Sequence, residues 1–101
     1  MISNNLFSLE GKTALVTGGS TGLGLMATAG LAAAGATVFI VSRKLENCKK
    51  AANKINGYNF KGQAIPFKGD LSSEPGISKI VDELNTKNTE LHVLINNAGR
   101  T

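Results

Sequence analysis

The chain has 101 residues, 42% of them apolar, and a formal net charge of +4 from 11 basic and 7 acidic side chains. This length suits one small domain, and the apolar content is too high for a disordered chain. The basic residues are scattered and aromatic residues make up only 5% of the sequence. The charge therefore predicts a solvated basic surface rather than a nucleic-acid-binding face, and we expect no nucleic-acid partner.

A single cysteine, Cys48, excludes an internal disulfide and a cysteine-clustered metal site. His92 is the only histidine and has no ligand set beside it, so we expect no metal site and no catalytic role for it. The longest apolar stretch, residues 30–41, is interrupted by glycines, and the first residues lack the pattern of a secretory signal. These features predict a soluble, cytoplasmic protein without a membrane partner.

The first predicted element is a strand over Lys12–Thr17, nearly all apolar, as expected for a strand buried on both faces. A turn with the spacing G-x-x-x-G-x-G follows, formed by Gly18, Gly22 and Gly24. Gly18 lets the chain turn sharply, and the absence of Cβ atoms at the other two lets a pyrophosphate approach the backbone. The next helix would offer free N–H groups and the positive end of its dipole to the phosphates.

That helix is predicted over Leu23–Ala34. It is apolar on every side, so we expect it to be deeply packed, with Gly35 as its stop. A second strand is predicted over Thr37–Ser42 and an amphipathic helix over Leu45–Ile55. One apolar stripe of this second helix contains Leu45, Cys48, Ala52 and Ile55. Because no base accompanies the thiol in this stripe, it is interpreted as a small buried apolar group rather than a nucleophile.

A third strand is predicted over Gln63–Phe67 and a fourth over His92–Asn96, with a helix between them. That helix starts near Glu74, and its apolar residues recur at helical spacing at Ile77, Ile80, Val81 and Leu84. Strands alternating with helices predict a parallel sheet with right-handed crossovers. The fold class is therefore α/β, a Rossmann-type doubly wound sheet in the arrangement βαβαβαβ with strand order 3-2-1-4.

Ligands of such sheets bind at the carboxyl ends of the strands, near the switch point between strands 1 and 4. The glycine turn at 17–24 and the sequence Asn-Asn-Ala-Gly at 96–99 both fall there. We expect residues 1–101 to be a partial NAD(P)-binding domain, truncated after the fourth strand. That strand would then be an open edge, with Val93 and Ile95 lacking neighbours, and the chain alone would be poorly stable.

The turn Thr-Gly-x-x-x-Gly-x-Gly, the aspartate Asp70 after the third strand and Asn-Asn-Ala-Gly after the fourth resemble the classical short-chain dehydrogenases/reductases. The whole chain resembles the first half of that fold. The surroundings of Gly18 and Asp70 are similar to the 3-oxoacyl-(acyl carrier protein) reductase and gluconate dehydrogenase branch. The resemblance implies an oxidoreductase that transfers hydride between a nicotinamide cofactor and a small carbonyl or alcohol substrate, in a protein that we expect to be a homo-oligomer.

The resemblance also implies the roles of individual residues. The pyrophosphate and ribose would be lined by Gly18, Ser20, Thr21, Gly22, Leu23 and Gly24. Asp70 would accept a hydrogen bond from the adenine amino group, with Leu71 beside the ring. The adenosine ribose would be contacted by Asn97, Ala98 and Gly99.

The end of the second strand distinguishes NADP from NAD. NAD enzymes usually place a carboxylate there for the ribose 2′-hydroxyl, but this chain has Ser42 followed by Arg43 and Lys44. A guanidinium pairs with a phosphate through two hydrogen bonds, whereas a carboxylate would repel it. We therefore favour NADP over NAD, with Arg43 as the main contact and Ser42 as a hydroxyl donor.

The family's chemistry uses a serine and a Tyr-x-x-x-Lys pair further along the chain, in which the tyrosine is the general acid or base. The only tyrosine here is Tyr58, and the residue four positions later is Gly62, so we expect no catalytic residue and no turnover. One alternative is a dinucleotide-binding module without chemistry, or an inactive fragment. Another is a different α/β domain such as a methyltransferase, which the glycine spacing and Asn-Asn-Ala-Gly disfavour. The glycines are not followed by Lys-Ser/Thr, which excludes a standard ATP-binding P-loop.

Overall fold

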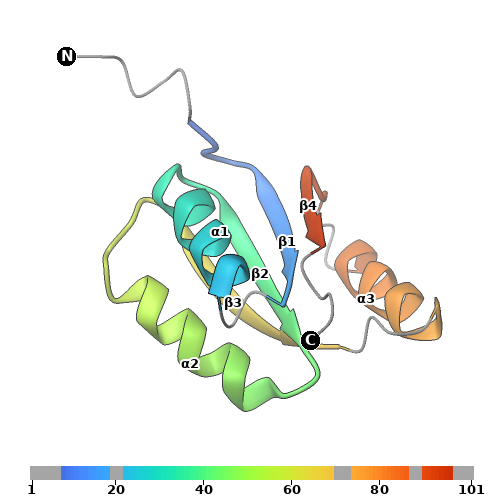
Figure 1. The fold of residues 1–101 in the computed structure, drawn as a ribbon. Coiled ribbons are helices and arrows are strands. Elements are labelled where there is room, and N and C mark those ends of the chain that lie inside the picture. The colour runs from blue at the N-terminus through green and yellow to red at the C-terminus, as the bar shows by residue number, and fades with distance from the viewer. Residues whose placement is uncertain (1–7, 19–21, 70–73, 87–89, 97–101) are drawn as a thin grey trace.

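The computed structural model describes residues 8–18, 22–69, 74–86 and 90–96 (Figure 1). Its elements in chain order are β1 (Thr13–Thr17), α1 (Gly22–Ala33), β2 (Thr37–Ser42), α2 (Leu45–Asn56), β3 (Gln63–Lys68), α3 (Glu74–Thr86) and β4 (Val93–Asn96). The strands pair in parallel in the order β3-β2-β1-β4. The predicted fold class and strand order are confirmed, and element boundaries differ from the expected ones by a residue or so.

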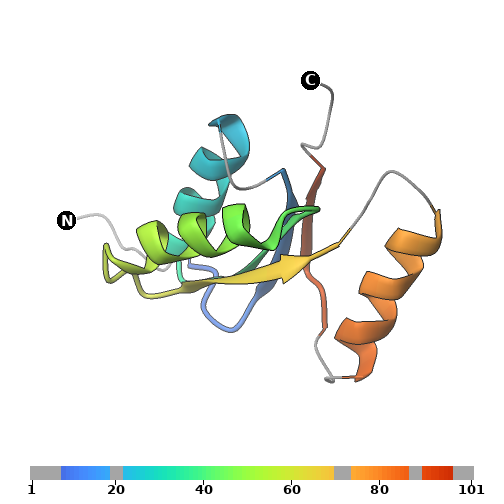
Figure 2. The same ribbon diagram turned by 90° about the horizontal axis from the view of Figure 1, so that it is seen from below.

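The sheet is covered on both faces, because α1 and α2 lie on one side and α3 on the other (Figure 2). The apolar cluster under α1 and α2 is built mainly from small and β-branched residues: Ala14, Val16, Ala32, Ala36, Val38, Ile40, Cys48, Ala51, Ala52, Ile55 and Ala64. The cluster under α3 contains Leu15, Phe39, Val41, Phe67, Ile80 and Leu84. Consecutive strand residues alternate between the two clusters, as the two-residue period of a strand requires.

The helix α1 is not deeply packed, so the expectation from its composition is wrong. Leu23 and Met26 are 72% and 68% exposed, whereas the buried residues are Gly24, Thr28 and Ala32. These small residues are four positions apart and share one face of the helix. Because an evenly apolar helix has no preferred face, its orientation follows from which side chains are small enough for close contact with the sheet.

The strand β4 also differs from expectation. Val93 and Ile95 are half-buried and pack against the cluster under α1 and α2, whereas Leu94 is 61% exposed on the opposite face. Among the described strands, β4 pairs with β1 alone, so it does form an edge of the sheet. The exposed apolar surface of this edge is therefore Leu94 rather than its two neighbours.

The outer edge of β3 is partly closed by the last residue of α2. The Asn56 side chain accepts a hydrogen bond from the Ala64 N–H at 2.8 Å and donates one to the Ala64 carbonyl at 3.0 Å. An amide side chain here replaces one residue of a neighbouring strand, which satisfies backbone groups that an edge strand otherwise leaves open.

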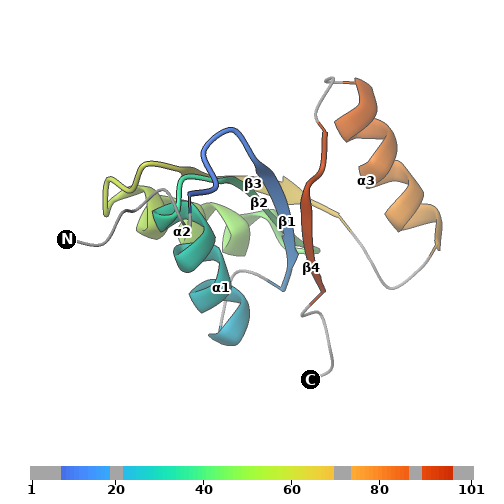
Figure 3. The same cartoon turned by 90° about the horizontal axis from the view of Figure 1, so that it is seen from above.

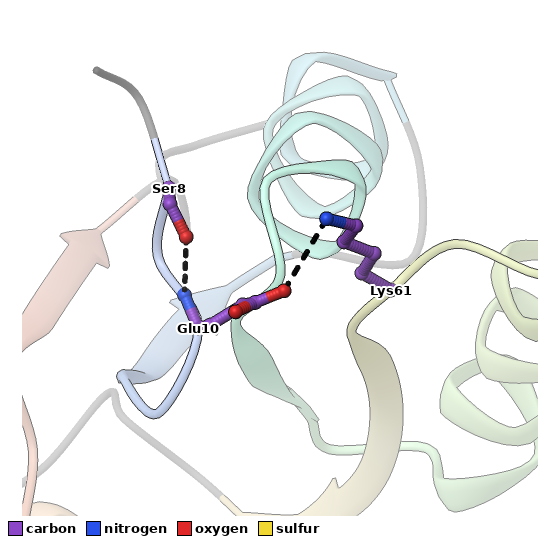
Figure 4. A network of polar contacts seen from close by, with 3 residues as sticks. All are labelled: Ser8, Glu10 and Lys61. Atoms are coloured by element: carbon purple, nitrogen blue, oxygen red, sulfur yellow. Dashed lines mark hydrogen bonds and ion pairs between the residues drawn. The ribbon is translucent and has the colours of Figure 1, made fainter. Parts of the chain in front are cut away.

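A surface network lies at the amino end of the sheet (Figure 4). The Glu10 N–H donates to the Ser8 hydroxyl at 3.3 Å, and the Lys61 Nζ lies 3.4 Å from the Glu10 carboxylate. Both side chains of this ion pair are more than half exposed, so it contributes less than about 1 kcal/mol to stability.

No helix among the described residues is long and apolar enough to cross a membrane.

The turn before β3 passes very close to the end of α1. The Gly62 N–H donates to the Ala32 carbonyl at 2.9 Å. A Cβ at Gly62 would overlap the Ala36 carbonyl oxygen and lie 2.7 Å from that of Ala32. Only glycine permits this approach, because both neighbours are backbone atoms that cannot rotate away.

Replacing Gly62 by alanine should therefore lower the free energy of unfolding by about 2 kcal/mol or more, since the backbone must separate to admit the Cβ. Gly30→Ala is the matched control, because no atom of the described residues lies within 4 Å of the new Cβ in the interior of α1. That variant should gain up to about 1 kcal/mol from helix propensity. Urea unfolding of both variants measures the difference, and equal effects would contradict the close approach.

Candidate functional site

The carboxyl ends of the strands meet at one edge of the sheet. Thr17 of β1 is in register with Val41 of β2 and Asn96 of β4. The Gly18 N–H donates to the Val41 carbonyl at 3.1 Å, and the Gly69 N–H donates to the Ser42 carbonyl at 3.0 Å. These backbone hydrogen bonds hold the starts of the loops after β1 and β3 beside the end of β2. The sequence analysis predicted this edge from the parallel pairing of the strands.

The glycine bend after β1 leads directly into α1. Gly18 and Gly22 have φ values of 66° and 57°, in the left-handed region that side-chain-bearing residues disfavour. Within the described residues, no atom lies within 4 Å of the position that a Cβ at Gly22 would take. The first turn of α1 contains no acidic residue, so no carboxylate of that turn neutralises the positive end of its dipole. The amino end of α1 therefore carries a partial positive charge, and no described atom occupies the Cβ position of its first residue.

The ends of β1 and β4 are also joined, and both point toward the amino end of α1 (Figure 3). The Thr17 hydroxyl donates to the Ile95 carbonyl at 3.4 Å. Residues 97–99, predicted to contact the adenosine ribose, follow β4 directly in sequence. Seven predicted contacts lie outside the described residues and stay predictions: Ser20, Thr21, Asp70, Leu71, Asn97, Ala98 and Gly99.

Arg43 occupies the turn between β2 and α2, next to this edge. The Lys44 N–H donates to the Ser42 hydroxyl at 3.2 Å, which closes a short turn around Arg43. The Arg43 side chain is exposed, and in the described part of the chain it forms no ion pair. The guanidinium is therefore available to a ligand that reaches the end of β2.

A cavity of about 430 Å³ lies beside Arg43, between the end of β3 and α3. Its lining residues are Arg43, Phe67, Lys68, Gly69, Lys79, Ile80 and Glu83. Three of these side chains are cations and one is a carboxylate, so the cavity has an excess of positive charge. The sequence analysis did not predict that Lys79, Ile80 and Glu83 of α3 line this cavity. The helical pattern does not indicate which residues of α3 face the end of β3.

Cys48 lies below this edge and is fully buried, as predicted. Its thiol is 3.8 Å from the Phe67 carbonyl oxygen. Burial raises the pKa of the Cys48 thiol, and hydrogen bonds from its surroundings, including Phe67 and Ser42, oppose the shift only in part. The thiol is therefore a packing group below the site and not a nucleophile within it.

Tyr58, the only tyrosine of the chain, and the groups that could bind a metal ion are considered next. Tyr58 is 57% exposed in the turn between α2 and β3 and packs on Phe60, with ring centroids 5.3 Å apart. This turn precedes β3 and so lies at the amino end of the strands, away from the site. Within the described ranges, no three His, Cys, Asp or Glu side chains gather where they could hold a metal ion.

Comparison with known proteins agrees with this architecture. The profile of the family described as short chain dehydrogenase matches residues 12–101. The chain belongs to the short-chain dehydrogenase family. Its members are oxidoreductases that use NAD or NADP and act on small carbonyl or alcohol substrates.

Among curated members of this family, the rhamnolipids biosynthesis 3-oxoacyl-[acyl-carrier-protein] reductase of Pseudomonas aeruginosa is 47% identical over 93 residues. The alignment covers 92% of this chain and 35% of that reductase. The chain thus spans about a third of the length of the relatives that it matches.

Two solved structures of family members have the same fold. The RhlG/NADP active-site complex of Pseudomonas aeruginosa has a TM-score of 0.81 at 45% identity, over 94% of this chain and 37% of that one. The 2-keto-3-deoxy-D-gluconate dehydrogenase of Streptococcus agalactiae has a TM-score of 0.75 at 38% identity, over 94% and 35%. The predicted resemblance to the 3-oxoacyl reductase and gluconate dehydrogenase branch is therefore confirmed by both sequence identity and fold.

The buried thiol gives a prediction about alkaline pH. Because the folded state keeps the Cys48 proton to higher pH than the unfolded state, its contribution to stability is present at neutral pH and lost as pH rises above about 8.5. Urea midpoints of the native chain should therefore fall between about pH 8 and pH 10 more steeply than those of Cys48→Ala. A thiol reagent should label folded Cys48 much more slowly than the urea-unfolded chain, and equal labelling rates would contradict its burial.

Proposed function

We propose that this chain is the cofactor-binding, amino-terminal part of an NADP-dependent short-chain oxidoreductase. The observation that carries the proposal is the electropositive amino end of α1, reached through the left-handed glycines Gly18 and Gly22 at the end of β1. The bound nicotinamide would supply or accept hydride. The residues of this chain bind and orient the dinucleotide.

The diphosphate would be held by the bend and the first turn of α1. Backbone N–H groups at a helix terminus have no partners within the helix, and the dipole adds a partial positive charge there. Because no described atom occupies the Cβ position of Gly22, a phosphate oxygen fits close to the backbone there, and any side chain would displace it. The proposed contacts are Gly18, Ser20, Thr21, Gly22, Leu23 and Gly24.

The cofactor preference would be determined at the end of β2. Arg43 is exposed, and the Ser42 hydroxyl, which accepts a hydrogen bond from the Lys44 N–H, lies beside it at the end of β2. A 2′-phosphate placed there meets a guanidinium and a hydroxyl but no carboxylate, which is the opposite of the arrangement that binds a ribose diol. The neighbouring lysines Lys68 and Lys79 extend the positive potential along the cavity beside Arg43.

The remaining contacts would come from the loops after β3 and β4. Asp70 and Leu71 would bind the adenine ring, because Gly69 is held against the end of β2 and these residues follow it. Asn97, Ala98 and Gly99 would contact the ribose after β4. The proposed substrate is a small carbonyl or alcohol compound, in keeping with relatives named as a 3-oxoacyl reductase and a gluconate-type dehydrogenase.

The first test concerns the 2′-phosphate. Arg43→Asp should weaken binding of NADPH by about tenfold to a hundredfold, because a charge-assisted pair is replaced by repulsion, while NADH binding changes much less. Lys50→Asp is the matched control, since it makes the same charge change at an exposed position of α2. Titration followed by nicotinamide fluorescence measures both dissociation constants, and an unchanged NADPH-to-NADH ratio in Arg43→Asp would remove Arg43 from this role.

The second test concerns the diphosphate. Gly22→Ala should weaken NADPH and NADH binding alike, by about tenfold or more, because the methyl group projects into the space assigned to the phosphates. The strain of a positive φ should cost only about 1–2 kcal/mol of stability. The control Gly30→Ala lacks both features and should bind normally. If Gly22→Ala binds as the native chain does, the phosphates are bound elsewhere.

A further inference from the structure

The cavity beside Arg43 combines an apolar interior with a charged rim. Phe67 of β3 and Ile80 of α3 line it and are only 8% and 2% exposed, so they form its inner wall. Arg43, Lys79 and Glu83 also line it, and these side chains are exposed. A ligand in this cavity would therefore contact apolar groups inside and meet charged side chains from the turn after β2 and from α3 at the opening.

Close packing holds this part of α3 against the end of the sheet, on the face opposite to α1 and α2 (Figure 2). Ile80 belongs to the apolar cluster that also contains Val41 and Phe67. Gly69, directly after β3, makes room for it, because a Cβ at Gly69 would lie 2.6 Å from the Ile80 Cδ1 and 3.1 Å from the Val41 Cγ1. Lys79 precedes Ile80 in the helix, so its backbone has a defined position beside the cavity.

In the described helix α3, Lys79 and Glu83 are one turn apart and yet form no ion pair with each other. A lysine placed four residues before a glutamate is the weaker orientation of such a pair. Among the described residues, the Lys79 ammonium has no anionic partner, so it remains available to a ligand. Both side chains line the same cavity and act in opposite directions on an anion there, since Lys79 attracts it and Glu83 repels it.

A 2′-phosphate bound at Arg43 would have more charge and more acceptors than one guanidinium satisfies. A phosphate monoester carries a charge of about −1.5 to −2 at neutral pH, and it has three terminal oxygens. A guanidinium supplies one positive charge and, in the bidentate geometry, bonds two of these oxygens. One oxygen and part of the charge therefore remain for a second cation, and the Lys79 ammonium borders the same cavity as Arg43.

We propose that Lys79 is a second specificity-determining residue for NADP, whose ammonium binds the 2′-phosphate together with the Arg43 guanidinium. This inference rests on the proposed function and extends the cofactor site to α3. Glu83, one turn further along the helix, lowers the affinity of the same site by repulsion, so the two residues together set its strength. NAD has an uncharged hydroxyl in place of the phosphate, so neither residue changes NAD binding much.

Two nucleotides that differ only in this phosphate provide the test: adenosine 2′,5′-bisphosphate and adenosine 5′-monophosphate. Lys79→Gln should weaken binding of the bisphosphate about threefold to tenfold, because one attractive charge is removed, and should leave the monophosphate affinity within about twofold. Lys50→Gln is the matched control, since Lys50 is an exposed residue of α2 outside the lining of the cavity, and it should bind both nucleotides as the native chain does. Isothermal titration calorimetry measures the dissociation constants.

Glu83→Gln makes the opposite change of charge on the same helix. It should strengthen binding of the bisphosphate by about twofold to fivefold, because a repulsive charge is removed. Asp82→Asn should have no effect, since Asp82 is an exposed residue of α3 outside the lining of the cavity. Opposite effects at Lys79 and Glu83 support the proposal, because a general loss of helix stability would change both affinities in the same direction.

An unchanged affinity for the bisphosphate in Lys79→Gln would exclude Lys79 from the site, and so would a loss that is equal for both nucleotides. In either case, the proposed function is kept if the native chain prefers NADPH to NADH and Arg43→Asp loses that preference. A native chain that binds neither NADPH nor NADH would instead contradict the proposed function, and this inference with it.

Discussion

The parallel pairing of β1 with a strand on each side is the constraint on which the rest of the structure depends. It brings the ends of β1, β2 and β4 to one edge, where the Gly18 N–H bonds to Val41 and the Thr17 hydroxyl bonds to Ile95. Because these bonds involve backbone groups at fixed register, the start of the glycine bend has one position relative to both neighbours. The helix terminus that follows is directed to the same edge, which is why a ligand site can form there.

Packing on the two faces of the sheet keeps this arrangement in place. Small residues of α1 let the helix approach β1 and β2 closely, with the Thr28 hydroxyl bonded to the Gly24 carbonyl at 2.8 Å. On the other face, Phe39 and Phe67 form an edge-to-face pair with centroids 6.1 Å apart, beneath α3. The two clusters thus fix the helices to the sheet independently of the exposed side chains of Leu23, Met26 and Leu94.

Charge is distributed unequally between the two ends of the sheet. Glu10 and Lys61, which form an ion pair, both precede strands, and so do Glu90 and His92, whose side chains lie 3.8 Å apart; both pairs therefore lie at the amino end. At the carboxyl end, Arg43, Lys68 and Lys79 border a single cavity and form no ion pair with a described residue. This polarity favours an anionic ligand at the carboxyl end and leaves the amino end to structural contacts.

The sequence by itself determined the order of strands and helices, the parallel sheet and the glycine bend, because these follow from local periodicity, glycine spacing and the geometry of crossovers. It also determined that Cys48 is buried, because its neighbours at helical spacing are apolar. Only the tertiary structure decided which face of α1 is covered, that Leu94 is exposed, that α3 lines the cavity beside Arg43, and that the His92 imidazole accepts a hydrogen bond from the Thr13 N–H. Each of these depends on contacts between residues far apart in the chain, and a local pattern carries no information about which distant surface will meet it.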